Sequence, residues 1–271
     1  MIYNENMNRR LWRTTTLILM MTLVAIVSAA DRQVINLTNG EWPPLLSEKA
    51  PNYGALSEIV TRAFALENID VHYGFYPWIR GLDLARTGEW DGTLAWSITD
   101  DRARDFYISK EPIYTTVSVF FHRKSLTVNE ESLSELKKYR IGLSRGYHYG
   151  GGLDEMAANK QLNIEYAKDD LLNFKKLLAG RVDLVPIEVK VGLAIIKQHL
   201  TEKEQAQIVY ATSPVIANSI YLLLSKKVSR NKQLMERFDR GLKQLIDNGE
   251  YQEYLLPGAA FTGITGSSSK P

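Results

Sequence analysis

Residues 90–109, which read WDGTLAWSITDDRARDFYIS, decide how the rest of the chain is interpreted. The stretch opens with a turn signal at 91–92, continues through the short apolar run 93–96, which predicts a buried strand, and then becomes polar. Residues just beyond the carboxyl end of a parallel strand lie over the crevice where open α/β sheets bind ligands. Ala95 at the strand end, the hydroxyl of Ser97 and the guanidinium of Arg102 are therefore candidate ligand contacts.

The residue pattern leaves two interpretations of Arg102 open. A guanidinium is planar and permanently charged, so it can hold a carboxylate through two parallel hydrogen bonds. In the other interpretation, Arg102 belongs to a surface loop and pairs with Asp100, Asp101 or Asp105, because most loop charges are solvated.

The first thirty residues have the pattern of a secretory signal peptide. Three arginines form a cationic region, residues 17–27 form an apolar region, and residues 28–30 (SAA) offer small side chains for cleavage. The apolar run is shorter than the ~20 residues that a membrane-spanning helix needs. We therefore expect residues 1–30 to be a cleaved signal peptide and the mature protein to be located in a bacterial periplasm.

The mature chain is electrically balanced. The whole chain has 33 Lys and Arg against 31 Asp and Glu, and removing residues 1–30 takes away three of the former and one of the latter, leaving 30 of each. Nucleic acids and anionic membranes bind basic surfaces, so we expect neither as a partner. The absence of cysteine excludes a disulfide framework and a cysteine nucleophile.

Strand and helix patterns alternate along the mature chain, which predicts an α/β fold. We expect strands at 33–37, 69–75, 93–96, 114–121, 140–143, 164–166, within 181–188, at 208–210 and at 219–224. We expect helices after Gly54, from 78 onward, and at 132–138, 171–179, 189–199 and 231–247. Residues 263–271 are small and polar, which is typical of a disordered tail.

Several motifs resemble one known family. The run SITDDR at 97–102, followed by FYIS at 106–109 and by Glu111-Pro112, is similar to the extracellular solute-binding proteins of family 3, the periplasmic polar amino-acid-binding proteins of ABC transporters. A second landmark, AGRVDLVPIE at 179–188, follows in the expected order. The resemblance implies a periplasmic-binding-protein-like type II fold, in which two α/β lobes are joined by a two-segment hinge with a ligand cleft between them.

The resemblance also implies lobe boundaries. Lobe 1 is discontinuous and comprises residues 31–122 and 215–258, while lobe 2 comprises residues 123–214. The chain would cross between the lobes near 121–125 and return near 213–214, and residues 259–271 would form the disordered tail.

Charged ligand contacts are implied on both lobes. In this family, the residue at the position of Arg102 and backbone amides near Tyr147 and His148 hold a carboxylate, and the acid at the position of Glu188 holds an ammonium group. The amides belong to the glycine-rich loop 144–152, which precedes a helix, and a helix N-terminus attracts anions. The residues alone give Glu188 another role, as the cap of helix 189–199.

Trp42 and Trp78 stand at the family positions that present aromatic faces to the ligand. Without the resemblance, Trp42 would cover the sheet edge and Trp78 would pack its helix. The chain departs from the family pattern where Leu94 and Ala95 replace frequent serines, and where Tyr147 and His148 replace small hydroxyl residues. The implied pocket is more apolar and more crowded, which makes a small or aromatic carboxylate, or another amine-bearing compound, an alternative to a standard polar amino acid.

We therefore expect a monomeric binding protein that captures a small carboxylate-bearing ligand, an amino acid or a related compound, and delivers it to the permease of an ABC transporter. We predict no cofactor, no catalytic residue and no metal site, because the histidines lack metal-ligand spacing and no GxSxG motif occurs. Two alternatives stay open. One is a cyclohexadienyl dehydratase-like enzyme in which Glu188 and His148 act as acid and base, and the other is a ligand-sensing protein that acts on a membrane receptor.

Overall fold

The computed structural model describes residues 32–128, 135–211 and 216–255. The predicted signal peptide, the predicted tail and the return crossing expected near 213–214 lie outside these residues, as does the first part of the helix expected at 132–138. Within the described ranges, no helix combines the length and the apolar character that crossing a membrane requires.

The described strands form one mixed sheet, whose main path runs β2-β1-β3-β10-β5-β8-β6-β7, with β4 paired to β10 and β9 paired to β5. Parallel pairing joins β1 to β3 and joins β6 to both β7 and β8. The strands are β1 (Gln33–Asn39), β2 (Ile69–Phe75), β3 (Gly92–Trp96), β4 (Phe106–Ile108), β5 (Tyr114–Arg123), β6 (Arg140–Ser144), β7 (Asn163–Ala167), β8 (Leu184–Glu188), β9 (Ile208–Tyr210) and β10 (Ile216–Ser225).

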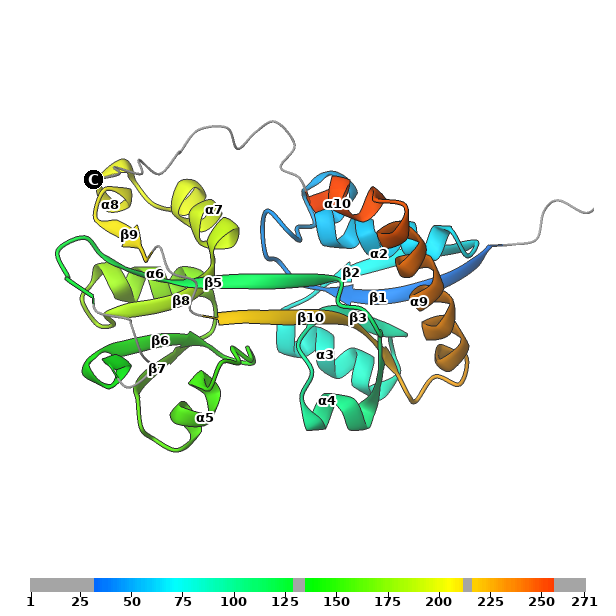
Figure 1. Cartoon of the computed structure of the whole chain (residues 1–271), viewed down its shortest axis with the longest axis horizontal. Helices are drawn as coiled ribbons and strands as arrows, with labels where there is room; N and C mark the ends of the chain where they lie inside the picture. Colours follow the sequence, from blue (N-terminus) through cyan, green and yellow to red (C-terminus); the bar gives the residue numbers. More distant parts are fainter. Residues whose placement is uncertain (1–31, 129–134, 212–215, 256–271) are drawn as a thin grey trace, which may run out of the picture. The chain divides into compact units, whose positions relative to one another are not determined.

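Helices connect most of the strands (Figure 1). They are α2 (Ala55–Ala65), α3 (Trp78–Thr87), α4 (Asp100–Asp105), α5 (Leu153–Ala158), α6 (Asp170–Leu178), α7 (Val189–His199), α8 (Glu202–Gln205), α9 (Asn231–Asp247) and α10 (Glu250–Leu255), with short 3-10 helices at Pro51–Tyr53 and Glu135–Lys138. Local chemistry sets several of these ends. Asp169 caps α6, Thr201 forms a capping box on α8, and Gly88 ends α3 in the left-handed conformation.

Two long strands, β5 and β10, carry the chain through the middle of the sheet (Figure 1). The first half of β10 pairs with β5, and its second half pairs with β3 and β4. The first half of β5 pairs with β10, and its second half pairs with β8 and β9. The β1–β4 strands and the β6–β9 strands are therefore linked through this pair, and the chain passes along it twice.

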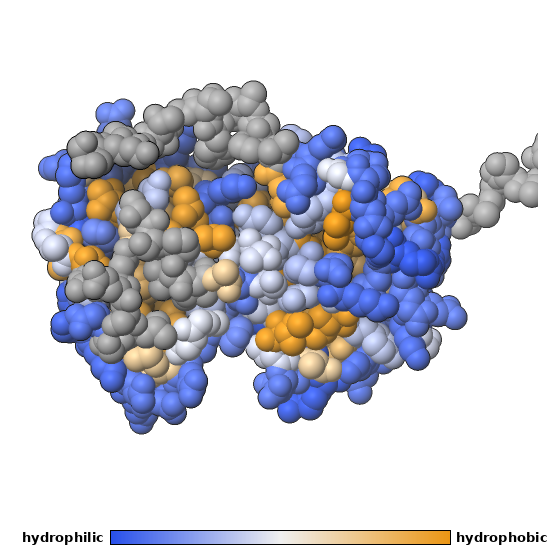
Figure 2. Space-filling model, in the orientation of Figure 1, coloured by the Kyte–Doolittle hydropathy of each residue, from blue (hydrophilic) through white to orange (hydrophobic). Residues whose placement is uncertain are grey.

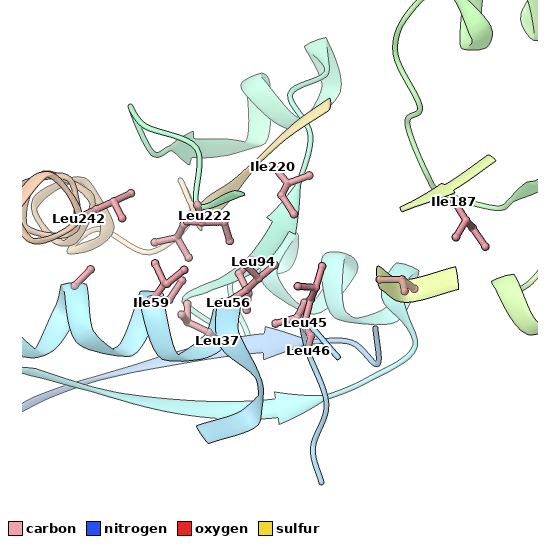
Figure 3. Packing of buried hydrophobic residues seen from close by; sticks show 14 of the residues in the cluster. Leu37, Leu45, Leu46, Leu56, Ile59, Leu94, Ile187, Ile220, Leu222 and Leu242 are labelled. Carbon is pink, nitrogen blue, oxygen red and sulfur yellow. The ribbon is translucent and has the colours of Figure 1, made fainter. Parts of the chain in front are cut away.

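The largest buried core is built on the amphipathic faces of α2 and α9. Apolar residues recur every three or four positions on both helices, which places them on one face of each. Figure 3 shows Leu56 and Ile59 of α2 and Leu242 of α9 converging with Leu222 of β10. A second core forms around β6, with Ile141 and Leu143 among its fully or nearly fully buried members. Hydrophilic residues cover much of the face seen in Figure 2, and its hydrophobic residues form separate patches.

Helices α2 and α9 approach so closely that only glycine fits at position 241. A Cβ atom there would lie 2.0 Å from the carbonyl oxygen of Ala63. We expect Gly241→Ala to force the helices apart and to lower the free energy of unfolding by about 1–3 kcal/mol. Urea unfolding checks this, with Gln244→Ala as the control, because Gln244 is an exposed residue of the same helix. The control should change the free energy of unfolding by less than ~0.5 kcal/mol, and an equally small change for Gly241→Ala would contradict the close packing.

Candidate functional site

All eight residues predicted from the sequence to contact a ligand line one pocket, with a cavity volume of about 80 Å³. Trp42, Trp78, Ala95, Ser97 and Arg102 reach it from the β1–β4 strands and their connections. Tyr147, His148 and Glu188 reach it from the β6–β9 strands and their connections. The structure thus brings together residues that are up to 146 positions apart in the sequence. Their role as ligand contacts stays a prediction.

Arg102 lies on α4, and its guanidinium is turned back toward the end of β3. Nη1 donates to the backbone oxygen of Ser97 at 2.9 Å and to its hydroxyl at 3.1 Å, and Nη2 donates to the backbone oxygen of Gly146 at 3.2 Å. The charged group also lies 4.6 Å from the ring centroid of Trp96. Burial lowers the pKa of Arg102 to about 10, so the side chain remains a cation at neutral pH.

The surface-loop interpretation of Arg102 does not describe this geometry. Asp101 pairs with Arg104, and Asp105 pairs with Arg86. Arg102 itself is buried and forms no ion pair within the described residues. Its hydrogen bonds to Ser97 and Gly146 use three of the five N–H donors that a guanidinium carries.

Glu188 ends β8 and has the cap role and the pocket position at once. One carboxylate oxygen accepts the backbone N–H of Val191 at 2.9 Å, which caps α7, and the other accepts the hydroxyl of Tyr114 at 3.2 Å. Burial raises the pKa of Glu188 above its ordinary value. The Tyr114 hydroxyl therefore ties this carboxylate to β5, the strand shared by both parts of the sheet.

The loop from Ser144 to Gly152 differs in one respect from the expectation. The N–H of Tyr147 already donates to the backbone oxygen of Ser144 at 3.3 Å, because the loop turns sharply there. The Tyr147 amide therefore already has a hydrogen-bond acceptor, whereas the expectation was an amide free to donate to a ligand carboxylate. The backbone oxygen of His148 accepts from the side-chain amide of Asn218, on β10, at 2.6 Å. The imidazole Nδ1 of His148 lies 3.1 Å from a carboxylate oxygen of Asp154.

Glycine permits two close approaches around the pocket. A Cβ at Gly40 would lie 2.6 Å from the indole of Trp78, so the ring rests on the bare backbone after β1. A Cβ at Gly146 would lie 2.3 Å from Ile79, and Gly146 has a φ of +81°, which favours glycine. The turn at 146 can therefore bring its carbonyl oxygen to Arg102.

The end of β3 directs Leu94 and Ala95 to different surroundings. Leu94 is fully buried in the main core and does not line the pocket, whereas Ala95 does. Ala95 has a φ of +66°, an uncommon value for a residue other than glycine, and the register of β10 shifts opposite this point, between Tyr221 and Leu223. The irregular backbone lets two consecutive residues serve the core and the pocket.

Ten further residues line the pocket without having been predicted as ligand contacts: Trp96, Thr116, Ser118, Gly146, Tyr149, Asp170, Pro186, Ile187, Asn218 and Ile220. Thr116 and Ser118 stand two positions apart on β5, so they share a face of the strand. Two hydroxyl residues at that spacing within an apolar run were a usable signal. Asp170 gave a weaker signal for a pocket position. Asp169 and Asp170 are both suitable caps for α6, and the sequence does not show which of them is left to face the pocket.

Asp170 presents a buried carboxylate to the pocket. One oxygen accepts the hydroxyl of Ser144 at 2.5 Å, and the other accepts the hydroxyl of Tyr147 at 3.1 Å. Asp169 makes the capping bond to Leu172 instead. Burial is the largest influence on Asp170 and raises its pKa to about 6. Asp170 forms no ion pair with any residue that the structure describes.

The pocket therefore combines three buried charges. Arg102, Glu188 and Asp170 are 7%, 5% and 4% exposed, and none of the three has an ion-pair partner in the described part of the chain. Burying a charge without a partner costs several kcal/mol, and such groups are concentrated at functional sites. This arrangement can bind a small polar ligand that carries charges of both signs.

Solved structures match the chain over most of its length, although no protein-family model and no curated protein sequence matches it. An ancestral arginine-binding protein bound to arginine aligns with a TM-score of 0.67 and 18% identity, covering 82% of this chain and 96% of that one. A histidine kinase sensor domain with similarity to periplasmic binding proteins aligns with a TM-score of 0.69 and 18% identity, covering 83% of this chain and 96% of that one. An amino-acid ABC transporter substrate-binding protein from Streptococcus pneumoniae, bound to L-arginine, aligns with a TM-score of 0.65 and 19% identity, covering 83% of this chain and 94% of that one. These similarities confirm the predicted type II fold of periplasmic binding proteins.

The raised pKa of Asp170 predicts how this residue changes stability with pH. Between its ordinary pKa of 3.8, which applies to the unfolded chain, and its folded pKa of about 6, the folded state binds a proton that the unfolded state does not. Acidification through this window therefore stabilises the fold through Asp170, by up to about 3 kcal/mol.

Chemical unfolding of the wild type and of Asp170→Asn between pH 7.5 and 3.5 measures this contribution. The wild-type free energy of unfolding minus that of the variant should increase by about 3 kcal/mol as the pH falls, because asparagine does not titrate. Any hydrogen-bond defect in the variant adds a constant offset. A pH-independent difference, or one that decreases on acidification, would contradict the raised pKa.

Proposed function

We propose that the protein is a periplasmic solute-binding protein that captures a small carboxylate-bearing ligand, an amino acid or a related compound, and delivers it to the permease of an ABC importer. The observation that carries the proposal is the pair Arg102 and Glu188. Arg102 comes from α4, which follows β3, and Glu188 comes from the end of β8; the two side chains line the same pocket and are buried without ion-pair partners among the described residues.

The pair has the chemistry to orient a zwitterion. The Arg102 guanidinium supplies parallel N–H donors for a ligand carboxylate, and the Glu188 carboxylate accepts from a ligand ammonium group. A ligand with both groups would neutralise both buried charges at once. The indoles of Trp42 and Trp78 provide large, rigid contact area for the remainder of the ligand.

Closure of two lobes around the ligand is the proposed mechanism, with lobe 1 at 31–122 and 215–258 and lobe 2 at 123–214. Strands β5 and β10 would form the two-segment hinge. Two hydrogen bonds support contact between the proposed lobes across the pocket, because each joins a residue of lobe 1 to a residue of lobe 2. They run from Arg102 to Gly146 and from Asn218 to His148. A ligand carboxylate at Arg102 would compete with the Gly146 oxygen for the guanidinium.

Solved binding proteins of this fold support the same function, since two of them bind arginine and one belongs to an amino-acid ABC transporter. A sensory role is a second candidate, favoured by the similarity to a histidine kinase sensor domain. The pocket would then capture the same class of ligand, and the closed form would act on a membrane receptor in place of a permease.

We assign no catalytic residue to the pocket. Glu188 and His148 both line it, but Glu188 caps α7 and accepts from Tyr114, and His148 pairs with Asp154. These contacts fix the orientation of both side chains. Turnover of prephenate or arogenate by the purified protein would establish the dehydratase alternative instead.

Arg102→Ala tests the proposed carboxylate contact. A thermal-shift screen of the twenty standard L-amino acids should first identify a ligand that raises Tm, because binding to the folded state stabilises it. Isothermal titration should then show that Arg102→Ala weakens that ligand by ~2–5 kcal/mol, through loss of a buried charge partner.

Arg104→Ala is the matched control, since Arg104 lies on the same helix and its side chain is exposed. Its affinity should equal that of the wild type. Loss of affinity in both variants, or in neither, would contradict a specific role for Arg102, and a screen without any Tm increase would contradict amino-acid binding.

A further inference from the structure

The pocket holds one more negative charge than the proposed zwitterion accounts for. If Arg102 holds the ligand carboxylate and Glu188 holds the ligand ammonium, as proposed above, the carboxylate of Asp170 remains without a counter-charge. Asp170 is 4% exposed, lines the same pocket and forms no ion pair within the described residues. The pocket therefore has two carboxylates for one guanidinium.

The contacts of Asp170 keep its carboxylate in place as an acceptor. Asn173 donates to the Ser144 hydroxyl oxygen at 3.1 Å, so the single proton of that hydroxyl is available for Asp170, which accepts it at 2.5 Å. The Tyr147 hydroxyl donates to the second carboxylate oxygen at 3.1 Å. These donors fix the orientation of the carboxylate, and none of them carries a charge.

Neutral donors stabilise a buried carboxylate only in part, because hydrogen bonds to neutral groups are weaker than those to a cation. Each carboxylate oxygen can accept more than one hydrogen bond, and these contacts leave part of that capacity unused. Trp42 is a further neutral neighbour of Asp170, so it adds no counter-charge.

We infer that Asp170 receives a second basic group of the ligand, so that the pocket selects compounds with one carboxylate and two basic groups, such as amino acids with a cationic side chain, over neutral compounds of the same shape. Arg102 would bind the carboxylate, Glu188 the ammonium group, and Asp170 the ammonium or guanidinium of the side chain. This assignment leaves no charge in the pocket without an opposite charge. It rests on the proposed function and specifies the class of ligand.

Matched pairs of ligands test the selection for charge. Isothermal titration of the wild type should compare L-arginine with L-citrulline, which replaces the guanidinium by a neutral group of similar shape, and L-lysine with L-norleucine, which lacks the side-chain ammonium. We expect the cationic member of at least one pair to bind at least tenfold more tightly than the neutral one.

Variants of Asp170 test whether this residue is the source of the preference. Asp170→Asn should reduce the cationic-to-neutral affinity ratio toward one. Asp170→Glu, which keeps the charge, should retain a preference for the cation. Asp169→Asn is the control, because Asp169 caps α6 from a position outside the pocket lining, and it should leave the ratio unchanged. If Asp170→Asn does not fold, Asp170→Ser supplies the same test with a smaller side chain.

The outcomes separate this inference from the proposed function. Tight binding of a neutral amino acid, with the cationic member of each pair equal or weaker, would overturn the role of Asp170 and leave the solute-binding function intact. A preference for the cation that persists unchanged in Asp170→Asn would also overturn it. Failure of every amino acid to bind would overturn both this inference and the amino-acid-binding part of the proposed function.

Discussion

Burying three charges in one small pocket is the constraint on which the rest of this structure depends. Arg102, Glu188 and Asp170 have each left water without gaining an opposite charge from the described residues. The chain offsets part of that cost with directed hydrogen bonds: backbone and hydroxyl oxygens accept from Arg102, an amide and a phenol donate to Glu188, and two hydroxyls donate to Asp170. What the hydrogen bonds leave uncompensated is a ready source of binding free energy for a ligand with complementary charges.

The fold holds these groups at the ends of its regular elements, where backbone geometry is well determined. Arg102 lies in the first turn of α4, Glu188 is itself the N-cap of α7, and Asp170 is the first residue of α6. Strand β5 adds the hydroxyls of Thr116 and Ser118 to the pocket lining, and β10 adds the amide of Asn218. The two strands also connect both sides of the pocket. Small rotations of this strand pair would change the distance between the charges without disturbing the hydrogen bonds inside either set of elements.

Periodicity and family resemblance together predicted the fold and the eight residues that the pocket brings together. The reason is that strand ends, turn residues and helix caps are local features that sequence records directly. Asp170 was missed because two adjacent aspartates can each cap α6, and only packing decides that Asp169 takes the cap and Asp170 faces the pocket. The occupied amide of Tyr147 was missed for a similar reason, since it depends on the turn that Gly146 makes against Ile79. The sequence also did not show that Leu94 packs in the core while Ala95 lines the pocket, because this arrangement depends on the left-handed backbone at Ala95.

The tight contact between Gly241 and Ala63 also bears on how the nascent chain folds during synthesis. Helix α2 leaves the ribosome early, but the surface that covers its apolar face comes from α9, close to the end of the described residues. The elements between β5 and β10 are complete well before α9 is made, so they can reach their packed state first. The contact between α2 and α9 therefore cannot form until nearly all of the described chain is available to fold.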